Sequence, residues 1–259
     1  MSNFITKLYF QSRLFITALL FIFHLNLFSQ SIIVDYKVKK NNKMYEASLV
    51  SNNEVSIYTE FYSKVKDSVH YEESVSGSKL IVYNASKNLH FIKDFKNQVI
   101  YCKGLILNKK YFVIDSIDIF DWKLEKDTLS VLGIKCQIAT LKFRGRNYTA
   151  YYTNEIKASD GPWKFNGLPG LILKVFSDDG LYDFEAVSLT KNISYQIDYK
   201  KLIDDYKNNR TEITFDEYKI DKNQKLKELY LKQKSEFSET GGSFSKYTEI
   251  EVFFEYPTD

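Results

Sequence analysis

The residues between 161 and 173 constrain this chain more than any other stretch. They read GPWKFNGLPGLIL and hold three of the chain's ten glycines, two of its three prolines and one of its two tryptophans. Glycine reaches backbone conformations that are closed to other residues, and proline fixes one of its two backbone angles. A local concentration of both predicts a backbone path that only these residues can follow. The flanking sequence reads as β-strands that lead into this segment and away from it.

The N-terminus has the three parts of a secretory signal peptide. Residues 1–13 carry one lysine and one arginine but no acid, residues 14–27 are almost wholly apolar, and the small residue Ser29 follows. The apolar run is shorter than the roughly 20 residues that a membrane-spanning helix needs. We therefore expect residues 1–29 to be removed on export, which leaves no membrane span; an uncleaved N-terminal anchor is the alternative. The expected location is the periplasm, the outer membrane or the cell exterior.

Export bears on the two cysteines, Cys102 and Cys136, which both lie in strand-like sequence. In an oxidising compartment, an even number of cysteines favours a disulfide. Two buried thiols are the alternative, because unpaired cysteine is among the most buried residue types. The sequence leaves both open, since a bridge requires close Cα atoms and spacing does not reveal them.

The charge of the chain argues against a nucleic-acid partner. Its formal net charge is +3, and no basic stripe with interleaved aromatic residues occurs along it. Such a stripe is the electrostatic footprint of proteins that bind nucleic acid. We therefore expect no nucleic-acid partner.

Strand-forming residues dominate the composition, with 20 Tyr and 20 Phe among 259 residues. Short runs of them recur between polar turns, which indicates an antiparallel β architecture. Arg144-Gly145 and Asp179-Gly180 have the composition of tight hairpin turns. The predicted strands are residues 31–38, 44–50, 54–62, 79–83, 89–93, 98–103, 111–116, 120–124, 134–143, 148–153, 170–176 and 181–189.

Three segments between these strands are predicted to be irregular. Residues 63–78 are polar and read as a loop, and residues 104–110 read as a connector. Lys126 followed by Asp127 reads as a turn, because polar residues of this kind are common in turns.

The hydrophobic period changes towards the C-terminus. Thr214 with Glu217 three residues later forms a capping-box pattern, and apolar residues then recur at helical spacing. We predict an amphipathic helix over residues 214–237 and a final strand over residues 248–256. The expected fold of residues 30–259 is one mainly β (β-rich α+β) domain, with a curved antiparallel sheet or half-barrel and this C-terminal helix.

The central residues also carry a family resemblance. Residues 167–172 spell Gly-Leu-Pro-Gly-Leu-Ile, and the chain resembles the GLPGLI family of exported proteins, known mainly from Bacteroidota. The resemblance covers residues 80–190 and is loose in the C-terminal third. It implies export, a cell-envelope setting and a mainly β fold, and it supplies no catalytic residues. Further matching text is WKL at 122–124, FRGR at 143–146, YYT at 151–153 and DGPWKF at 160–165.

Four residues of the central stretch are candidate binding residues. Trp163 and Phe165 would form an aromatic platform for a sugar, a peptide or a lipid if they were exposed. Packing in the core is the alternative, since aromatic side chains commonly bury their area. Pro169 and Gly170 predict a type II reversal that directs Leu168 into the core. The other reading of this loop, a phosphate cradle, lacks the Gly-Lys-Ser/Thr ending and a following helix.

Arg144 and Arg146 flank Gly145 and are the remaining binding candidates. Two guanidinium groups at a hairpin tip would clamp a carboxylate or a phosphate through paired hydrogen bonds. A solvated tip, or an internal salt bridge with Glu155 or Asp160, is the alternative, because most surface charges contribute little.

No catalytic signature is present in the sequence. His70 with Glu72 and Glu73 matches none of the common metal-site spacings, and His90 alternates with apolar residues in a strand. No nucleophile-elbow motif occurs. We therefore expect neither a metal nor another cofactor.

The expected function follows from export, aromatic-rich strands and the lack of a catalytic motif. It is that of a non-enzymatic cell-envelope module that binds a protein partner or an apolar, lipid-like ligand, or assists envelope assembly. The alternative is an exported hydrolase acting on peptides or glycans, motivated by the Gly/Pro loop beside two arginines and several acids. An apolar groove beneath the helix would favour the first, and a polar cleft with paired carboxylates the second.

Overall fold

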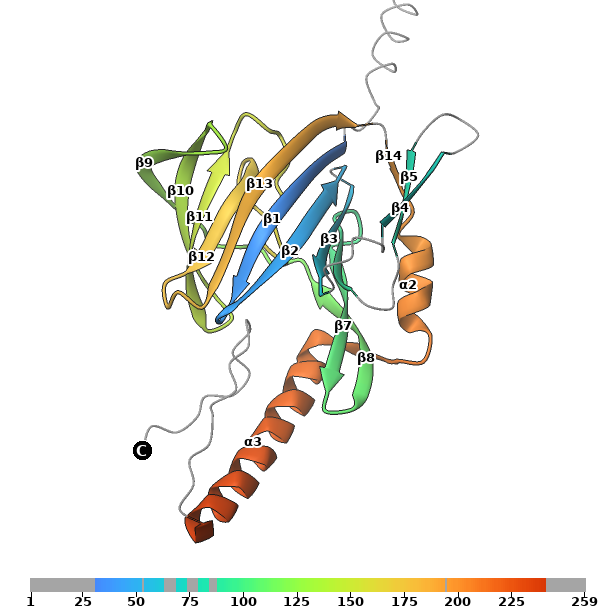
Figure 1. Ribbon diagram of the computed structural model, residues 1–259, viewed down its shortest axis with the longest axis vertical. Helices are drawn as coiled ribbons and strands as arrows, with labels where there is room; N and C mark the ends of the chain where they lie inside the picture. Colours follow the sequence, from blue (N-terminus) through green and yellow to red (C-terminus); the bar gives the residue numbers. More distant parts are fainter. Residues whose placement is uncertain are drawn as a thin grey trace, which may run out of the picture. The chain divides into compact units, whose positions relative to one another are not determined.

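The computed structural model describes residues 31–52, 54–62, 69–73, 79–83, 88–193 and 195–240. Strands dominate these residues, with two helices near the C-terminal end of the described part, which confirms the mainly β fold (Figure 1). The first strands are β1 (Ser31–Lys40), β2 (Lys43–Ser51), β3 (Val55–Phe61), β4 (Val69–Glu73), β5 (Lys79–Tyr83), β6 (Leu89–Asp94), β7 (Val99–Ile106) and β8 (Lys109–Ser116). The later elements are β9 (Lys123–Val131), β10 (Ile134–Phe143), β11 (Arg146–Thr153), β12 (Leu171–Ser177), β13 (Tyr182–Ile193), β14 (Tyr195–Ile197), α2 (Lys200–Lys207), β15 (Thr211–Thr214) and α3 (Phe215–Thr240).

Twelve strands form one curved sheet in the order β15-β8-β7-β6-β3-β2-β1-β13-β12-β11-β10-β9 (Figure 1). Most neighbours follow one another in the chain and run antiparallel, but β15 adds to β8 in parallel. The first strand, β1, lies between β2 and β13, so strands from early and late in the sequence meet there. Strands β14, β5 and β4 form a separate three-stranded sheet.

The alternation of residues in β1 shows how the sheet gains an apolar inner face. Val34, Tyr36 and Val38 are buried, whereas Lys37 between them is exposed. Successive side chains of a strand point to opposite faces, so residues two apart share one face. The inward residues of this strand therefore belong to the main core, and Lys37 on the other face reaches solvent.

The inner face is filled by the segment between β11 and β12, residues 154–170. Trp163 and Phe165 of this segment are fully buried. The Phe165 ring lies within 6.5 Å, centroid to centroid, of six aromatic rings. Four of these six contacts are edge-to-face, and such pairs add roughly 0.5–1.5 kcal/mol each beyond the buried area. The six neighbours are Phe120, Trp122, Phe143, Tyr148, Trp163 and Phe184.

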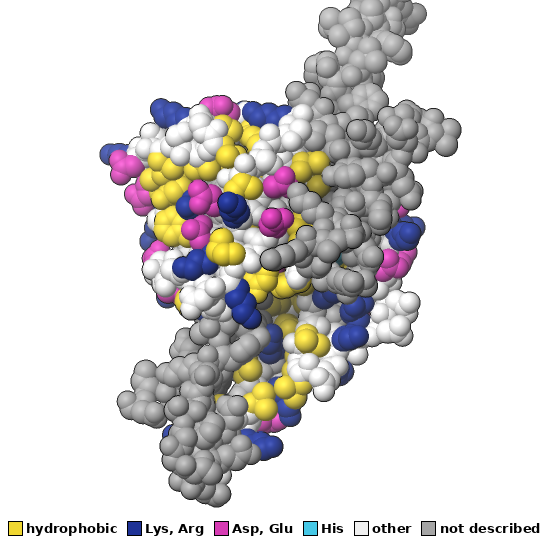
Figure 2. All heavy atoms as spheres, viewed as in Figure 1, with side chains coloured by type: hydrophobic (Ala, Val, Ile, Leu, Met, Phe, Trp, Pro, Cys, Tyr) yellow, Lys and Arg dark blue, Asp and Glu magenta, His cyan; other side chains and the backbone are white. Residues whose placement is uncertain are grey.

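The outer face of the sheet has two different environments. Under α2, Leu202 and Tyr206 join a second apolar cluster that includes Ile57, Ile92 and Phe112 of the sheet. Over β1, β12 and β13 the outer face is open, and basic and acidic side chains are interspersed on it (Figure 2). No single sign of charge gathers on the described part of that face.

Two hairpin turns predicted from the sequence are confirmed. Arg144 and Gly145 both have positive φ, 46° and 86°, and Phe143 pairs with Arg146 across the turn. A two-residue turn with both central residues in this region matches the twist of the strands that it joins. The turn between β12 and β13 likewise has Gly180 at a φ of 69°.

The expected helix is present as α3 and begins at its predicted cap. The Thr214 N–H donates to Glu217 Oε2 at 3.0 Å, and the Glu217 N–H donates to Thr214 Oγ1 at 3.3 Å. Tyr218 fixes the helix on β7, because its hydroxyl donates to the Leu105 carbonyl at 3.1 Å and accepts from the Leu105 N–H. Within the described residues, neither helix combines the length and the apolar character required to cross a membrane.

Two irregular segments expected from the sequence are strands instead. Lys126 and Asp127 lie inside β9, where a shift in the pairing with β10 accommodates the additional residues. A bulge of this kind lets polar residues remain in a strand without ending it. Residues 104–110 form the end of β7 and the start of β8, which turn at Leu107 with a φ of 51°.

Other differences concern elements that have weak local patterns. The loop expected over residues 63–78 contains β4, and α2 and β15 had no counterpart in the prediction. Of the strand expected over residues 120–124, only its last two residues are in β9. The strand predicted over residues 248–256 lies outside the described residues.

Candidate functional site

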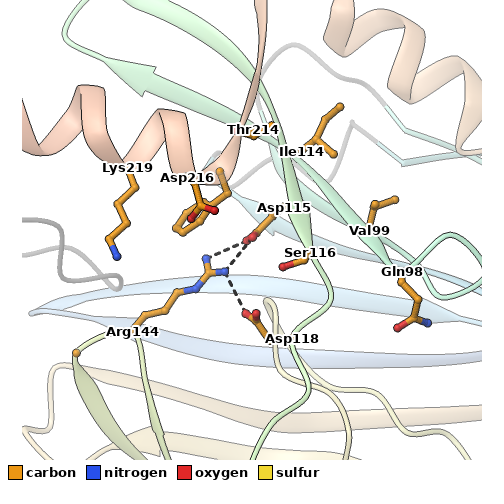
Figure 3. Close-up of a pocket in the computed structure, with 12 residues that line it drawn as sticks. Gln98, Val99, Ile114, Asp115, Ser116, Asp118, Arg144, Thr214, Asp216 and Lys219 are labelled. Carbon is orange, nitrogen blue, oxygen red and sulfur yellow. Dashed lines mark hydrogen bonds and ion pairs between the residues drawn. The ribbon is translucent and has the colours of Figure 1, made fainter.

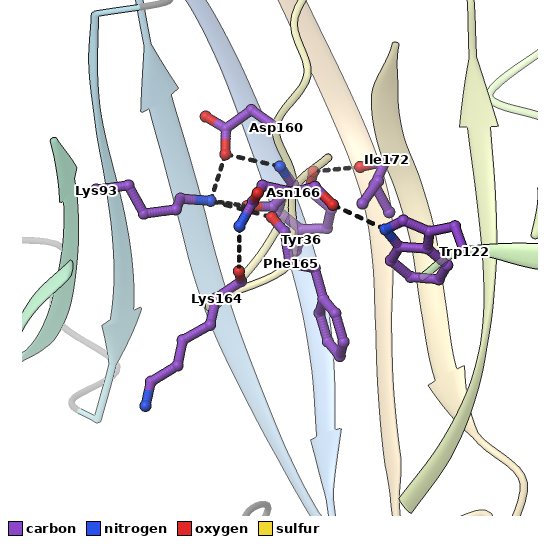
Figure 4. A network of polar contacts seen from close by, with 9 residues as sticks. Tyr36, Lys93, Trp122, Asp160, Lys164, Phe165, Asn166 and Ile172 are labelled. Atoms are coloured by element: carbon purple, nitrogen blue, oxygen red, sulfur yellow. Dashed lines mark hydrogen bonds and ion pairs between the residues drawn. The ribbon is translucent and has the colours of Figure 1, made fainter. Parts of the chain in front are cut away.

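A buried lysine anchors the loop that fills the inner face (Figure 4). Lys93 of β6 donates to the Asp160 carboxylate, to the Gly161 carbonyl at 2.7 Å and to the Phe165 carbonyl at 3.3 Å. Burial lowers the pKa of Lys93, although the neighbouring Asp160 charge opposes this effect. Loop carbonyls removed from water need such partners. The Lys93 ammonium therefore fixes the backbone path of the loop.

Two further long-range hydrogen bonds hold the loop and the start of β12, which follows it (Figure 4). The Tyr36 hydroxyl of β1 donates to the Ile172 carbonyl at 2.7 Å. Trp122 Nε1, from the segment before β9, donates to the Asn166 carbonyl at 2.9 Å. Trp122 thus holds the loop itself, and Tyr36 holds the start of β12, the strand that follows the loop.

The turn at Pro169 differs from the predicted type II reversal. Gly170 is outside the positive-φ region that such a turn needs, whereas Gly167 has a φ of 85°. The Gly170 N–H donates to the Leu168 carbonyl at 2.7 Å, which closes a three-residue turn around Pro169. Gly170 is needed because a Cβ atom there would lie 2.1 Å from the Thr153 carbonyl oxygen.

The candidate residues of this stretch divide between core and surface. Trp163, Phe165 and Leu168 are at most 1% exposed, and Pro169 is exposed. Trp163 has a φ of 52°, a conformation that costs about 1–3 kcal/mol and persists only where the surroundings enforce it. The two aromatic side chains pack in the core and form no surface platform.

A cluster that we call the clasp, consisting of Asp115, Arg144, Lys164 and Phe215, includes one residue of the same loop, Lys164. The Arg144 guanidinium donates to both oxygens of Asp115 at 2.9 Å and lies 3.8 Å from the centroid of the Phe215 ring. Lys164 donates to Asp115 at 2.8 Å. Arg144 also donates to Asp118 at 3.1 Å. Paired hydrogen bonds between a guanidinium and a carboxylate are among the strongest in proteins.

The clasp joins strands that are distant in the sheet. Asp115 is on β8, next to one end of the strand order, and Arg144 lies between β10 and β11, near the other end. Burial alone would raise the pKa of Asp115, but Lys164 and Arg144 outweigh it, so this pKa lies below its ordinary value. Asp115 is therefore held as a carboxylate between two cations.

The two candidate arginines have different partners. Arg146 forms an ion pair with Asp179 of the next hairpin and lies over the Tyr182 ring at 4.9 Å. Both arginines thus form internal salt bridges, as one alternative predicted. Their partners are not the expected Glu155 or Asp160.

A pocket of about 640 Å³, here the helix-side pocket, opens beside the clasp. Figure 3 shows Arg144 reaching Asp115 and Asp118, with Asp216 and Lys219 projecting from the first turns of α3. Its lining is Gln98, Val99, Ile114, Asp115, Ser116, Asp118, Arg144, Gly145, Thr214, Phe215, Asp216 and Lys219.

A second pocket of about 840 Å³, here the hairpin-side pocket, shares Asp118 and Arg144 with the first. These two residues form the wall between the pockets. Its lining is Asp118, Ile119, Phe120, Asp121, Lys123, Thr140, Leu141, Lys142, Phe143, Arg144, Asn147, Tyr148 and Asp178.

The candidate disulfide between Cys102 and Cys136 is absent. Cys102 and Cys136 are both buried and are not bridged, which is the alternative that the sequence left open. Cys102 is on β7 and Cys136 on β10, and these strands are not neighbours in the sheet. A bridge needs Cα atoms within about 7 Å.

The histidines and acids form no metal-binding group of three or more within the described residues. His70, Glu72 and Glu73 lie where the side chains are not described. His90 is buried, and its Nδ1 is 2.9 Å from Thr59 Oγ1.

Sequence reasoning missed the acids and the lysine that organise these sites. Asp115 and Lys93 each lie in an apolar strand, on the same face as buried neighbours such as Val113 and Phe91. A charge at an inward position of a strand needs a buried partner. The position of Asp115 and Lys93 on the inward face of their strands was therefore the signal available in the sequence. The partners Arg144 and Asp160 could not be found this way, because they are distant in the sequence.

A family model described as a protein of unknown function (Porph_ging) matches residues 142–174, which contain the Gly-Leu-Pro-Gly-Leu-Ile motif. No curated protein matches the chain. Two crystal structures of PNGF-II, in space groups C2 and P21, align with 73% of this chain at a TM-score of 0.51 and 19% identity. The chain spans only 32% of the length of PNGF-II, and the likeness concerns the fold alone. An uncharacterized conserved protein from Thermus thermophilus aligns with 72% of this chain and 91% of its own, at 8% identity and a TM-score of 0.40, too weak for an argument.

Proposed function

We propose that the protein is exported to the cell envelope and acts there as a binding module, without catalysing a reaction. The observation that carries this proposal is the clasp. Asp115 is held between Arg144 and Lys164, and its pKa is lowered. A general acid or base must exchange protons near neutral pH, and such a carboxylate does not. The clasp is suited to keeping two surface pockets in a fixed shape.

The pockets favour a polar ligand over the apolar, lipid-like one expected from the sequence. Trp163 and Phe165 occupy the inner face of the sheet, where a curved sheet would otherwise hold an apolar ligand. The lining of both pockets is rich in charged and polar side chains. Preformed pockets with a few placed polar groups are typical of ligand sites.

Export is supported by the leader sequence and by the resemblance to an exported family. Mass spectrometry of the protein purified from the envelope of its own cell tests it. We expect the chain to begin at Gln30. A mature chain that keeps residues 1–29, or that is recovered from the cytoplasm, would contradict the proposal.

Native mass spectrometry of the same purified protein tests binding. We expect the wild-type protein to retain a ligand. The ligand should be lost in Lys219→Ala if it binds in the helix-side pocket, or in Lys142→Ala if it binds in the hairpin-side pocket, and both lysines are exposed. Lys37→Ala is the matched control, because Lys37 is exposed on the outer face of β1, away from both pocket linings. No retained mass, or one that persists in both pocket variants, counts against these pockets as the binding site.

A hydrolase remains the second candidate because of the hairpin-side pocket. Asp121 and Asp178 line it with exposed carboxylates, and glycoside hydrolysis uses a pair of carboxyl groups. This candidate predicts turnover of a peptide or glycan that Asp121→Asn abolishes. The binding module predicts a bound ligand that is recovered unchanged.

A further inference from the structure

The hairpin-side pocket has the size of a small-ligand site and no net charge. Its volume of about 840 Å³ falls within the roughly 300–1,000 Å³ common for such sites. Three acids and three bases line it, so the formal charges cancel (3 − 3 = 0). A strongly charged ligand therefore gains little net Coulomb attraction there. These residues are Asp118, Asp121, Asp178, Lys123, Lys142 and Arg144.

Several polar side chains of this pocket form no hydrogen bonds within the part of the chain that the structure describes. Asp121, Asn147 and Asp178 are exposed, and their side chains form no hydrogen bond with any other residue that the structure describes. The Asp178 N–H donates to the Asn147 carbonyl at 3.1 Å, which holds these two residues side by side. A carboxylate accepts hydrogen bonds and an amide both donates and accepts them. Together these side chains suit a ligand whose groups both donate and accept hydrogen bonds.

An aromatic ring forms part of the pocket wall. Phe120 is half-buried, and its ring is fixed edge-on by Phe143 at 4.8 Å and by Trp122 at 5.9 Å between centroids. The neighbouring Ile119 is fully exposed. An immobilised ring offers apolar contact area with little further loss of conformational freedom.

We infer that the hairpin-side pocket binds a neutral saccharide, an inference that rests on the proposed binding function. A saccharide of this kind carries no charge, and its hydroxyl groups both donate and accept hydrogen bonds. Its C–H faces pack against aromatic rings such as that of Phe120. Asn147 and Asp178 bind the hydroxyl groups, and the Asp118–Arg144 pair forms the back of the pocket.

Calorimetric titration of the full-length protein tests this inference. The probes are hexasaccharides of β-1,4-linked glucose, β-1,4-linked N-acetylglucosamine, α-1,4-linked glucose and α-1,6-linked mannose, with the peptide acetyl-(Gly-Ser)₃-amide as a non-saccharide of similar polarity. We expect at least one saccharide to bind with a Kd below about 1 mM. The variant Asn147→Ala/Asp178→Ala should weaken binding at least tenfold.

Two control measurements on variants, together with the peptide probe, make the outcome decisive. Lys37→Ala should bind as the wild type does, and the double variant should keep the wild-type melting temperature because both of its side chains are exposed. If none of the four saccharides binds, or if the double variant binds them equally, the inference is overturned. Pocket-dependent binding of the peptide alone would overturn it while leaving the proposed binding function intact. Failure of the native-mass test for both pockets would instead count against these pockets as the site of the proposed binding function.

Discussion

Lys93 is the single residue on which the path of the central loop most depends. Replacing it with Met leaves the Asp160 carboxylate buried without its cation. Removing one partner of a buried pair costs about 3–5 kcal/mol. We expect Lys93→Met to lower the free energy of unfolding by that amount in urea denaturation.

The double variant Lys93→Met/Asp160→Asn supplies the comparison. It removes the buried charge while an amide oxygen still accepts the Gly161 N–H that Asp160 binds at 2.8 Å. It should recover part of the lost stability. A double variant no more stable than Lys93→Met would show that lost packing, rather than an unpaired charge, causes the effect.

Asp115 predicts an acid dependence of stability. Its pKa in the folded state is lower than the ordinary value of about 3.9, so the unfolded chain takes up the proton first as the pH falls. Its contribution is therefore complete above that ordinary value and is lost as the pH falls through the folded-state pKa. Melting temperatures of the wild type should drop more steeply below about pH 4 than those of Asp115→Asn.

A second measurement covers the case in which Asp115→Asn does not fold. The carboxyl carbon shift of Asp115, followed by NMR in the wild-type protein, should titrate below the ordinary aspartate pKa of about 3.9. Titration of Asp115 at or above that ordinary value of about 3.9 would contradict the clasp.

At the scale of elements, the turn around Pro169 yields a steric prediction. A methyl group at Gly170 would meet the Thr153 carbonyl oxygen at 2.1 Å, so β11 or the loop must move. Overpacking typically costs about 1–3 kcal/mol and can cost more. We expect Gly170→Ala to destabilise the protein by at least that amount in thermal unfolding.

Gly167→Asn is the matched control for this turn. Gly167 is exposed, and its positive φ is one that Asn tolerates. Its substitution should cost less than about 1 kcal/mol. Equal losses at both positions would show that the loop tolerates no change at all, and that the contact with Thr153 is not the cause.

The strands and hairpins were largely predictable from the sequence because their signals are local. The alternation in residues 31–38 and the Arg144-Gly145 turn each depend on neighbouring residues. The short helix α2 was not predictable, since its eight residues are stabilised by Leu202 and Tyr206 packing on the outer face. Tertiary contact of this kind leaves little trace in a local window.

At the scale of the whole molecule, the clasp connects the two ends of the sheet. Arg144→Lys keeps the charge but loses the planar fork and the stacking on Phe215. The loss should be about 1.5–3 kcal/mol, the value of hydrogen bonds to charged groups. Hydrogen exchange should become faster in both β8 and the β10–β11 hairpin.

Arg146→Lys is the appropriate comparison, because its partner Asp179 is 40% exposed, whereas Asp115 in the clasp is 2% exposed. An exposed ion pair contributes about 0–1 kcal/mol. Faster exchange confined to the β10–β11 hairpin in Arg144→Lys, without a change in β8, would show that the clasp does not couple the ends.

The candidate pockets could not be predicted because they depend on such distant pairs. Arg144 was identified as a binding candidate from the sequence, but Asp115 lies 29 residues earlier and was read only as part of a strand. The exposed Asp121, Asn147 and Asp178 belong to three different connections or strands. The pairing of β11 with β12 brings Asn147 and Asp178 together, whereas Asp121 comes from the connection between β8 and β9.

The position of β1 has a consequence for the order in which the chain can fold during synthesis. This strand pairs with β2 and with β13, and Ser31 meets Ile193 in the second pairing. A nascent chain that has not yet reached β13 leaves one edge of β1 open, and open edges recruit other strands. Contacts between such distant residues also form slowly. Most strands of this sheet therefore leave the ribosome before β1 can pair with β13. A chaperone that holds the emerging chain extended would protect the open edge of β1.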